Sequence, residues 1–122
     1  MTVLVCGSRD WTDTVLIRRT LMNLRANNGA DITKIVHGGC RGADTIAARI
    51  AKSLGFHVQE YPADWEYYGR AAGPIRNQQM LDEEKPYLVI AFATRLSGGT
   101  FDMVQRAQKA DIRVQLVEAE KP

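Results

Sequence analysis

The 122-residue sequence has few cysteines, no long apolar run and almost no excess charge, and each shortage excludes a class of protein. Its two cysteines, Cys6 and Cys40, are too few for a disulfide framework, and neither has the spacing of a metal ligand. We therefore expect reduced thiols, no metal and no cofactor. No apolar stretch approaches the roughly 20 residues of a membrane span, and the N-terminus lacks the features of a signal peptide. These absences predict a cytoplasmic protein with no membrane partner.

The charged residues are scattered along the chain rather than gathered in a basic stripe. Sixteen basic and 14 acidic residues give a net charge of +2. Proteins dedicated to duplex DNA usually concentrate lysine and arginine on one face. The composition therefore leaves a nucleic acid as an alternative partner but does not favour it.

Apolar segments alternate with helical patterns along the whole chain, which has the length of one domain, residues 1–122. We expect strands at residues 2–6, 33–36, 57–61, 87–93 and 113–118, with helices between them and a loop over residues 62–74. This order predicts a single α/β domain with a mostly parallel sheet and right-handed crossovers. The first and fourth strands are the most apolar, so they should be central. The prediction is a Rossmann-like, three-layer domain with five strands in the order 3-2-1-4-5.

Three junctions between a strand and the following helix are rich in glycine. Glycine lets the backbone approach a ligand closely, and the free N–H groups of a helix N-terminus favour an anion. One such turn has an equal claim to be geometry alone, but three would converge above the carboxyl ends of strands 1 and 4. None matches GxGxxG or GxxxxGK[ST], which disfavours a standard NAD dehydrogenase and excludes a P-loop NTPase. We expect a phosphate site in these loops: Gly7-Ser8-Arg9, Gly38-Gly39-Cys40-Arg41-Gly42 and Gly98-Gly99-Thr100.

Polar side chains beside these loops are candidate ligand contacts. Arg9 and Arg41 can clamp a phosphate; the alternative for Arg9 is an exposed arginine paired with Asp10. Asp44, in the first turn of its helix, either complements the helix dipole or hydrogen-bonds a ribose or water.

Two aromatic residues of the 62–74 loop and one histidine have both functional and structural interpretations. Trp65 and Tyr68 are candidates for stacking on a base, and equally for covering a sheet edge or a dimer contact. His37, at a strand end, is expected to be a hydrogen-bonded structural residue.

Four short motifs stand in order along the chain: Gly7-Ser8-Arg9-Asp10-Trp11, His37-Gly38-Gly39-Cys40-Arg41-Gly42-Ala43-Asp44, Gly73-Pro74-Ile75-Arg76-Asn77 and Gly98-Gly99-Thr100. Together they resemble the YspA-related family of the SLOG superfamily, and the resemblance extends over residues 2–117. It implies a Rossmann-like domain that binds a nucleotide or a nucleotide derivative, including NAD-derived molecules. It also implies ligand contact by Arg76 and Asn77 and assembly into a homodimer or higher homo-oligomer.

Within the superfamily, the resemblance to phosphoribohydrolases of the LOG type is partial. Those enzymes pair an arginine and a methionine four residues later with a PGGxGTxxE loop. Arg76 and Met80 match the first element, but Met103 stands where the catalytic glutamate is expected. Asp102, next to it, is the candidate replacement, with Arg76 as the second catalytic residue.

Three functions follow as hypotheses. The first is a binding or sensing module for a nucleotide or nucleotide-derived molecule. The second is an N-glycosidic hydrolase of nucleoside monophosphates. The third, from a resemblance to the DNA-processing protein DprA, is binding of single-stranded DNA.

Overall fold

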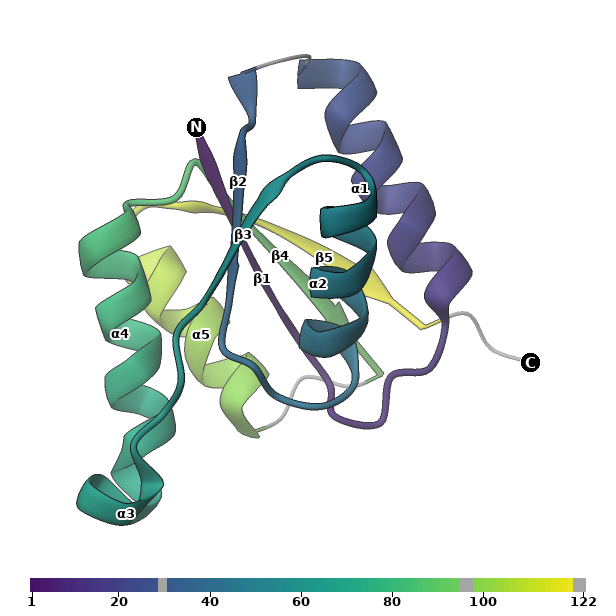
Figure 1. Ribbon diagram of the computed structural model, residues 1–122. Coiled ribbons are helices and arrows are strands. Elements are labelled where there is room, and N and C mark those ends of the chain that lie inside the picture. Colours follow the sequence, from purple (N-terminus) through teal and green to yellow (C-terminus); the bar gives the residue numbers. More distant parts are fainter. Residues whose placement is uncertain (29–30, 95–97, 120–122) are drawn as a thin grey trace.

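A computed structural model describes residues 1–28, 31–94 and 98–119 (Figure 1). Strands and helices alternate, as the apolar pattern predicts. The elements are β1 (Thr2–Gly7), α1 (Thr14–Asn28), β2 (Lys34–His37), α2 (Ala43–Ser53), β3 (His57–Glu60), α3 (Trp65–Tyr68), the 3-10 helix η2 (Gly69–Ala71), α4 (Ala72–Glu84), β4 (Leu88–Ala93), α5 (Gly98–Lys109) and β5 (Arg113–Glu118).

The five strands form one sheet in the order β3-β2-β1-β4-β5, with every neighbouring pair parallel. In the register, Val3 of β1 pairs with Ile35 of β2 and with Leu88 of β4. Every residue of β4 is buried, as is expected of a central strand with a helical layer on each face. The structure confirms the predicted fold class and strand order.

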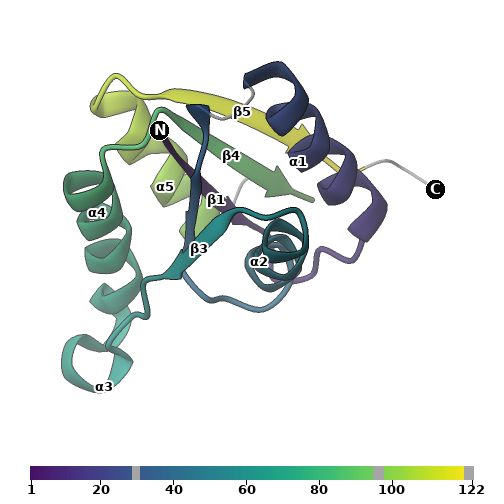
Figure 2. The same ribbon diagram turned by 45° about the horizontal axis from the view of Figure 1, so that its top comes forward.

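Two hydrophobic cores fill the space on the two faces of the sheet. Helices α1 and α2 cover one face, and α4 and α5 cover the other (Figure 2). The first core contains Trp11 and Phe92, whose rings meet edge to face with centroids 5.5 Å apart. The second core contains Met80 of α4 and Met103 of α5, both fully buried. The two methionines therefore hold α4 and α5 against the sheet.

Local signals explain where two of the helices begin and end. The Asp13 carboxylate accepts a hydrogen bond from the Leu16 amide at 3.0 Å, so Asp13 caps α1 as its sequence position predicts. Helix α4 ends at Glu84, and its C-cap Lys85 adopts φ 44° immediately before Pro86.

The segment over residues 62–74 is more ordered than expected, and the prediction of a continuous loop is wrong. It holds α3, η2 and the first residues of α4, which begins at Ala72. The Asp64 side chain accepts a hydrogen bond from the Tyr67 amide at 3.1 Å and so caps α3. Pro74 falls in the first turn of α4, where a missing N–H costs the helix no internal hydrogen bond.

Within the described residues, we find no helix with the length and apolar character needed to cross a membrane.

Candidate functional site

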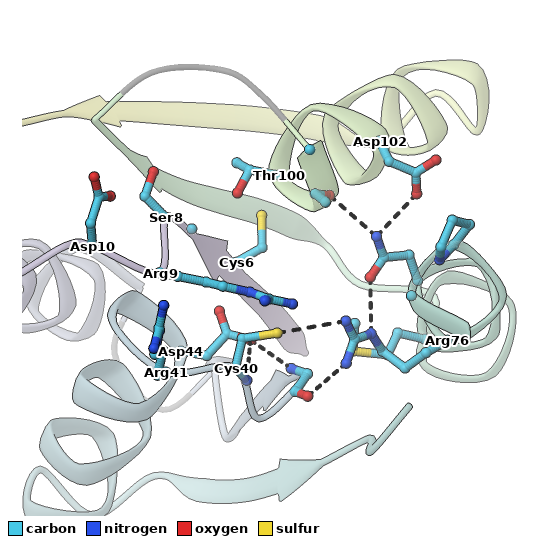
Figure 3. Close-up of a pocket in the computed structure, with 18 of the residues that line it drawn as sticks. Cys6, Ser8, Arg9, Asp10, Cys40, Arg41, Asp44, Arg76, Thr100 and Asp102 are labelled. Atoms are coloured by element: carbon cyan, nitrogen blue, oxygen red, sulfur yellow. Dashed lines mark hydrogen bonds between the residues drawn. The ribbon is translucent and has the colours of Figure 1, made fainter. Parts of the chain in front are cut away.

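A pocket of about 580 Å³ lies at the carboxyl ends of the central strands (Figure 3). Its size falls within the roughly 300–1,000 Å³ of small-molecule sites. Segments far apart in the sequence line it together: the loops after β1 and β2, the α3–α4 region and the start of α5. Most of the residues expected to contact a ligand lie in its wall, namely Gly7, Ser8, Arg9, Gly38, Arg41, Asp44, Trp65, Arg76, Asn77, Gly98, Gly99, Thr100 and Asp102.

The loops after β1, β2 and β4 are locked to one another by the backbone of Ser8. Its N–H donates to the Phe92 carbonyl at 2.8 Å, and its own carbonyl accepts from the Ala43 amide at 3.2 Å. A Cβ on Gly7 would lie 2.3 Å from the Phe92 oxygen, and one on Gly42 would lie 2.4 Å from the Ser8 oxygen. Gly42 does not line the pocket but has φ 82°, so its role is to let these loops meet.

The loop after β2 directs its amides toward protein acceptors rather than toward the pocket. The Gly38 amide donates to Asp44 Oδ2 at 3.0 Å, and the Cys40 amide reaches the same oxygen at 3.4 Å. The Gly39 amide donates to His37 Nδ1 at 3.0 Å, so His37 has the structural role expected of it. These three amides are therefore engaged, and a phosphate at this loop would meet side chains first.

Asp44 braces this loop, a role that the sequence did not suggest. Its side chain is 4 % exposed and lies among backbone amides at the start of α2. Burial raises the pKa of Asp44 to about 6, against the opposing effects of the Gly38 and Cys40 amides and of Arg76. Asp44 is thus a nearly dry carboxyl in the wall of the pocket.

Arg76 is a buried cation with only neutral hydrogen-bond acceptors. Arg76 is 7 % exposed. Its guanidinium donates to the Gly38 carbonyl at 2.6 Å, the Tyr61 carbonyl at 3.3 Å and Asn77 Oδ1 at 3.0 Å. Its remaining nitrogen faces the Cys40 sulfur at 3.9 Å. In the described part of the chain, no carboxylate oxygen lies within 4 Å of it. A buried charge of this kind attracts an anion.

Three further arginines reach the pocket from separate segments: Arg9, Arg41 and Arg70. In Figure 3 the Arg9 side chain extends across the pocket toward Arg76, whereas Arg41 lies apart from Arg76. Asp10 accepts a hydrogen bond from Thr94 Oγ1 at 3.0 Å, and we find no Arg9–Asp10 ion pair among the described residues. Arg9 therefore remains free to meet a ligand.

The start of α5 forms the opposite wall. Gly98, Gly99 and Thr100 place their backbone amides in the first turn, where a helix leaves its N–H groups without internal partners. Ser97, which precedes the glycine motif, lies outside the described residues. The N-terminus of α5 is thus the part of the site best suited to hold a phosphate.

Asp102, not Met103, faces the pocket from α5. Met103 is fully buried in the core. Asp102 Oδ2 accepts from Asn77 Nδ2 at 3.0 Å and from Arg106 Nε at 2.9 Å. The carboxylate is thereby held in place from two sides.

Of the two aromatic candidates, only Trp65 lines the pocket. It is 49 % exposed and lies beside Gly73, where an added Cβ would be 3.3 Å from its ring. Tyr68 instead packs edge to face on Tyr67, with centroids 4.7 Å apart. Gly39 also misses this pocket and borders a shallower neighbouring hollow.

Sequence reasoning missed several residues of the pocket wall. Thr94 directly follows β4 and hydrogen-bonds Ser8 after β1, and its place at the carboxyl end of the predicted central strand was a usable signal. Cys6 lines the pocket beside Cys40 of the expected loop, and burial raises the pKa of the Cys6 thiol, which keeps it protonated. Arg70 enters through the unexpected η2, so no pattern pointed to it.

Two known sequence groups are similar to this chain. A family model described as "YspA, cpYpsA-related SLOG family" matches residues 1–68. The "Gene 61 protein" of Mycobacterium phage D29 is 38% identical over 117 residues, covering 92% of both chains.

Among solved structures, DNA processing protein A (DprA) from Streptococcus pneumoniae superposes with a TM-score of 0.76 at 18% identity. This match covers 98% of the present chain and 50% of DprA. Phosphoribosylglycinamide formyltransferase from Bacillus halodurans gives 0.52 at 14% identity, covering 95% and 55%. The present chain spans about half of each structure, and at these identities the likeness shows the fold alone.

Proposed function

Because the chain belongs to the YspA, cpYpsA-related SLOG family, we propose that it binds a nucleotide or nucleotide-derived, phosphate-bearing small molecule in the cytoplasm. The ligand occupies the pocket above β1 and β4. The observation that carries this proposal is the Arg76 guanidinium, buried beside the pocket with neutral acceptors only. An anionic group supplies the missing countercharge, and burial makes that interaction stronger than it would be in water.

The remaining groups of the pocket suit the other parts of such a ligand. The first-turn amides of α5 and the guanidinium of Arg9 can share the phosphate with Arg76. Trp65 offers a partly exposed ring for a base. The site prediction therefore keeps Arg9, Arg76, Trp65 and the Gly98–Thr100 turn as contacts.

Binding of AMP, ADP-ribose and NAD, measured by calorimetry, tests the proposal directly. Mass spectrometry of whatever co-purifies with the protein identifies the ligand without a prior choice. Arg9→Gln should weaken binding about tenfold or more, since a charged hydrogen bond contributes about 1.5–3 kcal/mol. Arg18→Gln removes the same charge from the exposed face of α1 and is the matched control. No binding of any of these compounds, with no co-purifying ligand, refutes the proposal.

N-glycosidic hydrolysis is the second candidate, favoured by the Asp102 carboxylate in the pocket wall. With a nucleoside monophosphate bound, this carboxylate would stabilise the oxocarbenium-like centre or activate water. Release of free base from AMP, abolished by Asp102→Asn, would establish an enzyme. Binding of single-stranded DNA with a steep salt dependence would instead support the third hypothesis.

The family membership also leads us to propose a homodimer or higher homo-oligomer. Sedimentation equilibrium at several protein concentrations tests this directly, and a monomer at all of them refutes it.

A further inference from the structure

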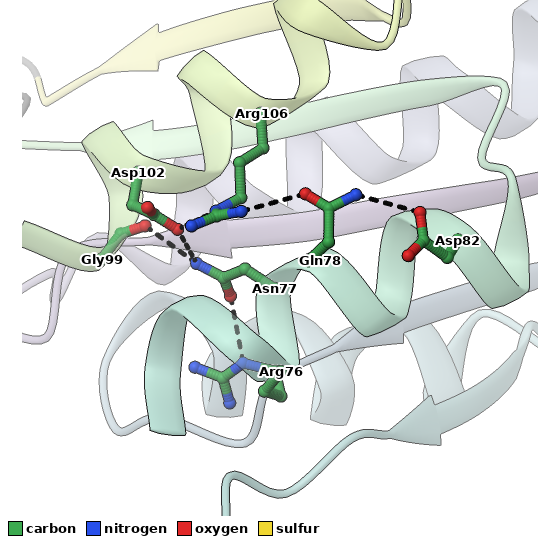
Figure 4. Close-up of polar contacts among 7 residues, drawn as sticks. All are labelled: Arg76, Asn77, Gln78, Asp82, Gly99, Asp102 and Arg106. Carbon is green, nitrogen blue, oxygen red and sulfur yellow. Dashed lines mark hydrogen bonds and ion pairs between the residues drawn. The ribbon is translucent and has the colours of Figure 1, made fainter. Parts of the chain in front are cut away.

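Asn77 occupies the space between the two opposite charges of the pocket. Its Oδ1 accepts from Arg76 Nε at 3.0 Å, and its Nδ2 donates to Asp102 Oδ2 at 3.0 Å and to the Gly99 carbonyl at 3.3 Å (Figure 4). The residue is 5 % exposed. Both N–H hydrogens of the amide are engaged, so Asn77 has little left to offer a ligand. These hydrogen bonds therefore point to a role for Asn77 other than the ligand contact expected from the sequence.

The orientation of this amide is fixed by its neighbours. Arg76 can only donate, so the group facing it must be the amide oxygen. Asp102 and the Gly99 carbonyl can only accept, so the group facing them must be the NH2. Turning the amide over would set donor against donor and acceptor against acceptor. Asn77 is thus held in one arrangement by three partners.

A second arginine, Arg106, pairs with Asp102 on the side away from Arg76, which is called the outer side here. Arg106 Nε donates to Asp102 Oδ2 at 2.9 Å, and Arg106 also donates to Gln78 Oε1 at 3.0 Å, which anchors it along the seam between α4 and α5 (Figure 4). Arg76, on the inner side, forms no ion pair among the residues described. Two cations and one carboxylate are therefore arranged so that the outer cation is paired and the inner one is left unpaired.

We propose that Asn77 is a positioning residue that keeps the Arg76 guanidinium and the Asp102 carboxylate from pairing with each other. This inference rests on the proposed function, because the unpaired Arg76 is what the ligand's anion meets. A carboxylate in direct contact with Arg76 would neutralise it and repel the anion. The neutral amide gives Arg76 Nε an acceptor without a charge, and it holds Asp102 toward Arg106. Ligand affinity is thereby set by a residue that does not contact the ligand.

An exchange of the two side chains tests this inference. The double variant Asn77→Asp with Asp102→Asn keeps composition and net charge, and the introduced amide can still donate to the introduced carboxylate. It moves the negative charge by one hydrogen bond, into contact with Arg76. Inorganic sulfate is the probe, because its charge is constant between pH 5.5 and 8. The double variant should bind sulfate about tenfold more weakly than wild type. Asp102→Asn alone should bind it several-fold more tightly.

The pH dependence of the single variant Asn77→Asp separates charge from structure. Its two carboxylates would share a proton at their contact, which raises the pKa of the pair. The loss of sulfate binding should therefore be largest at pH 8 and should shrink toward pH 5.5. Asp44 titrates near the same range, so each variant is compared with wild type at every pH. A purely structural defect would not recover on acidification.

The outcomes distinguish this inference from the proposed function. If wild type binds sulfate, phosphate and AMP and the double variant binds sulfate equally well, Asn77 is structural and the inference fails. If wild type binds none of the three, the proposed function fails as well. Should the double variant not fold, Arg106→Gln provides the test at a partly exposed residue. It should weaken sulfate binding several-fold relative to Arg113→Gln, a matched charge loss at the exposed start of β5; equal binding by these two overturns the inference.

Discussion

Replacing Asp44 by asparagine should change how the stability of the protein depends on pH. The side chain is 4 % exposed, and its pKa rises from an ordinary 3.8 to about 6, mainly through burial. The folded state thus binds this proton more tightly than the unfolded state does. The stability that Asp44 contributes is complete below about pH 3.8 and is lost as the pH rises through 6. A rise of this size corresponds to about 3 kcal/mol.

Asparagine keeps an oxygen that can accept from the Gly38 amide, but it cannot ionise. The difference in unfolding free energy between Asp44→Asn and wild type should therefore shift by about 2.4 kcal/mol between pH 4 and pH 7.5, in favour of the variant at the higher pH. Any constant effect of the new NH2 group cancels in this comparison. Urea unfolding followed by circular dichroism at several pH values gives the required free energies.

The sign of the shift also tests whether the Arg76 guanidinium is unpaired. If Arg76 paired with Asp44 in a buried ion pair, the pKa of Asp44 would fall and the variant would lose relative stability as the pH rises. A flat profile would mean that Asp44 is hydrated in solution. The first result would refute the view that the guanidinium remains unpaired, and the second would refute the view that this carboxyl is dry.

Three further predictions concern the loops and the core. Gly42→Ala should destabilise the protein by about 3 kcal/mol or more in urea unfolding, since φ at this position is 82° and the new Cβ would meet the Ser8 carbonyl. Gly99→Ala is the control and should change stability by less than about 1 kcal/mol, because nothing lies within 4 Å of an added Cβ there. Equal effects would contradict the close contact of the loops at Gly42. Ligand binding should shield Trp65 from acrylamide quenching, because Trp65 is 49 % exposed in the pocket wall, and a fluorescence response unchanged in Trp65→Phe would exclude that contact. Met103→Glu should lower the free energy of unfolding by more than about 3 kcal/mol because it buries a charge. Met103→Leu should lower it by less than about 1.5 kcal/mol. A well-tolerated glutamate would show that this position can reach the pocket.

The strand order could be predicted because the apolar content of each strand indicates how deeply that strand is buried in the sheet. The apolar runs in β1 and β4 identify the centre of the sheet, and parallel connections then leave few arrangements. The glycine motifs located the pocket for a related reason, since turns after parallel strands meet at one edge. The family assignment from the same motifs is confirmed by the match over residues 1–68.

The polar contacts within the pocket were beyond this kind of reasoning. Whether an arginine is neutralised depends on side chains that only the folded structure brings near. Arg76 receives its acceptors from Gly38, Tyr61 and Asn77, of which only the last is near it in sequence. Asp44 lies in a first turn that predicts a dipole contact, yet it reaches back to the preceding loop. The contacts of individual residues with a ligand remain predictions.

The excursion formed by α3 and η2 stands apart from the sheet at one end of α4 (Figure 1). Neither element contributes a buried residue, yet Trp65 and Arg70 from this segment border the pocket. Substitutions here leave both hydrophobic cores untouched while changing the aromatic surface and the charge at the entrance. The surface at the pocket entrance can therefore change through this short stretch, with no compensating change in the packing beneath it.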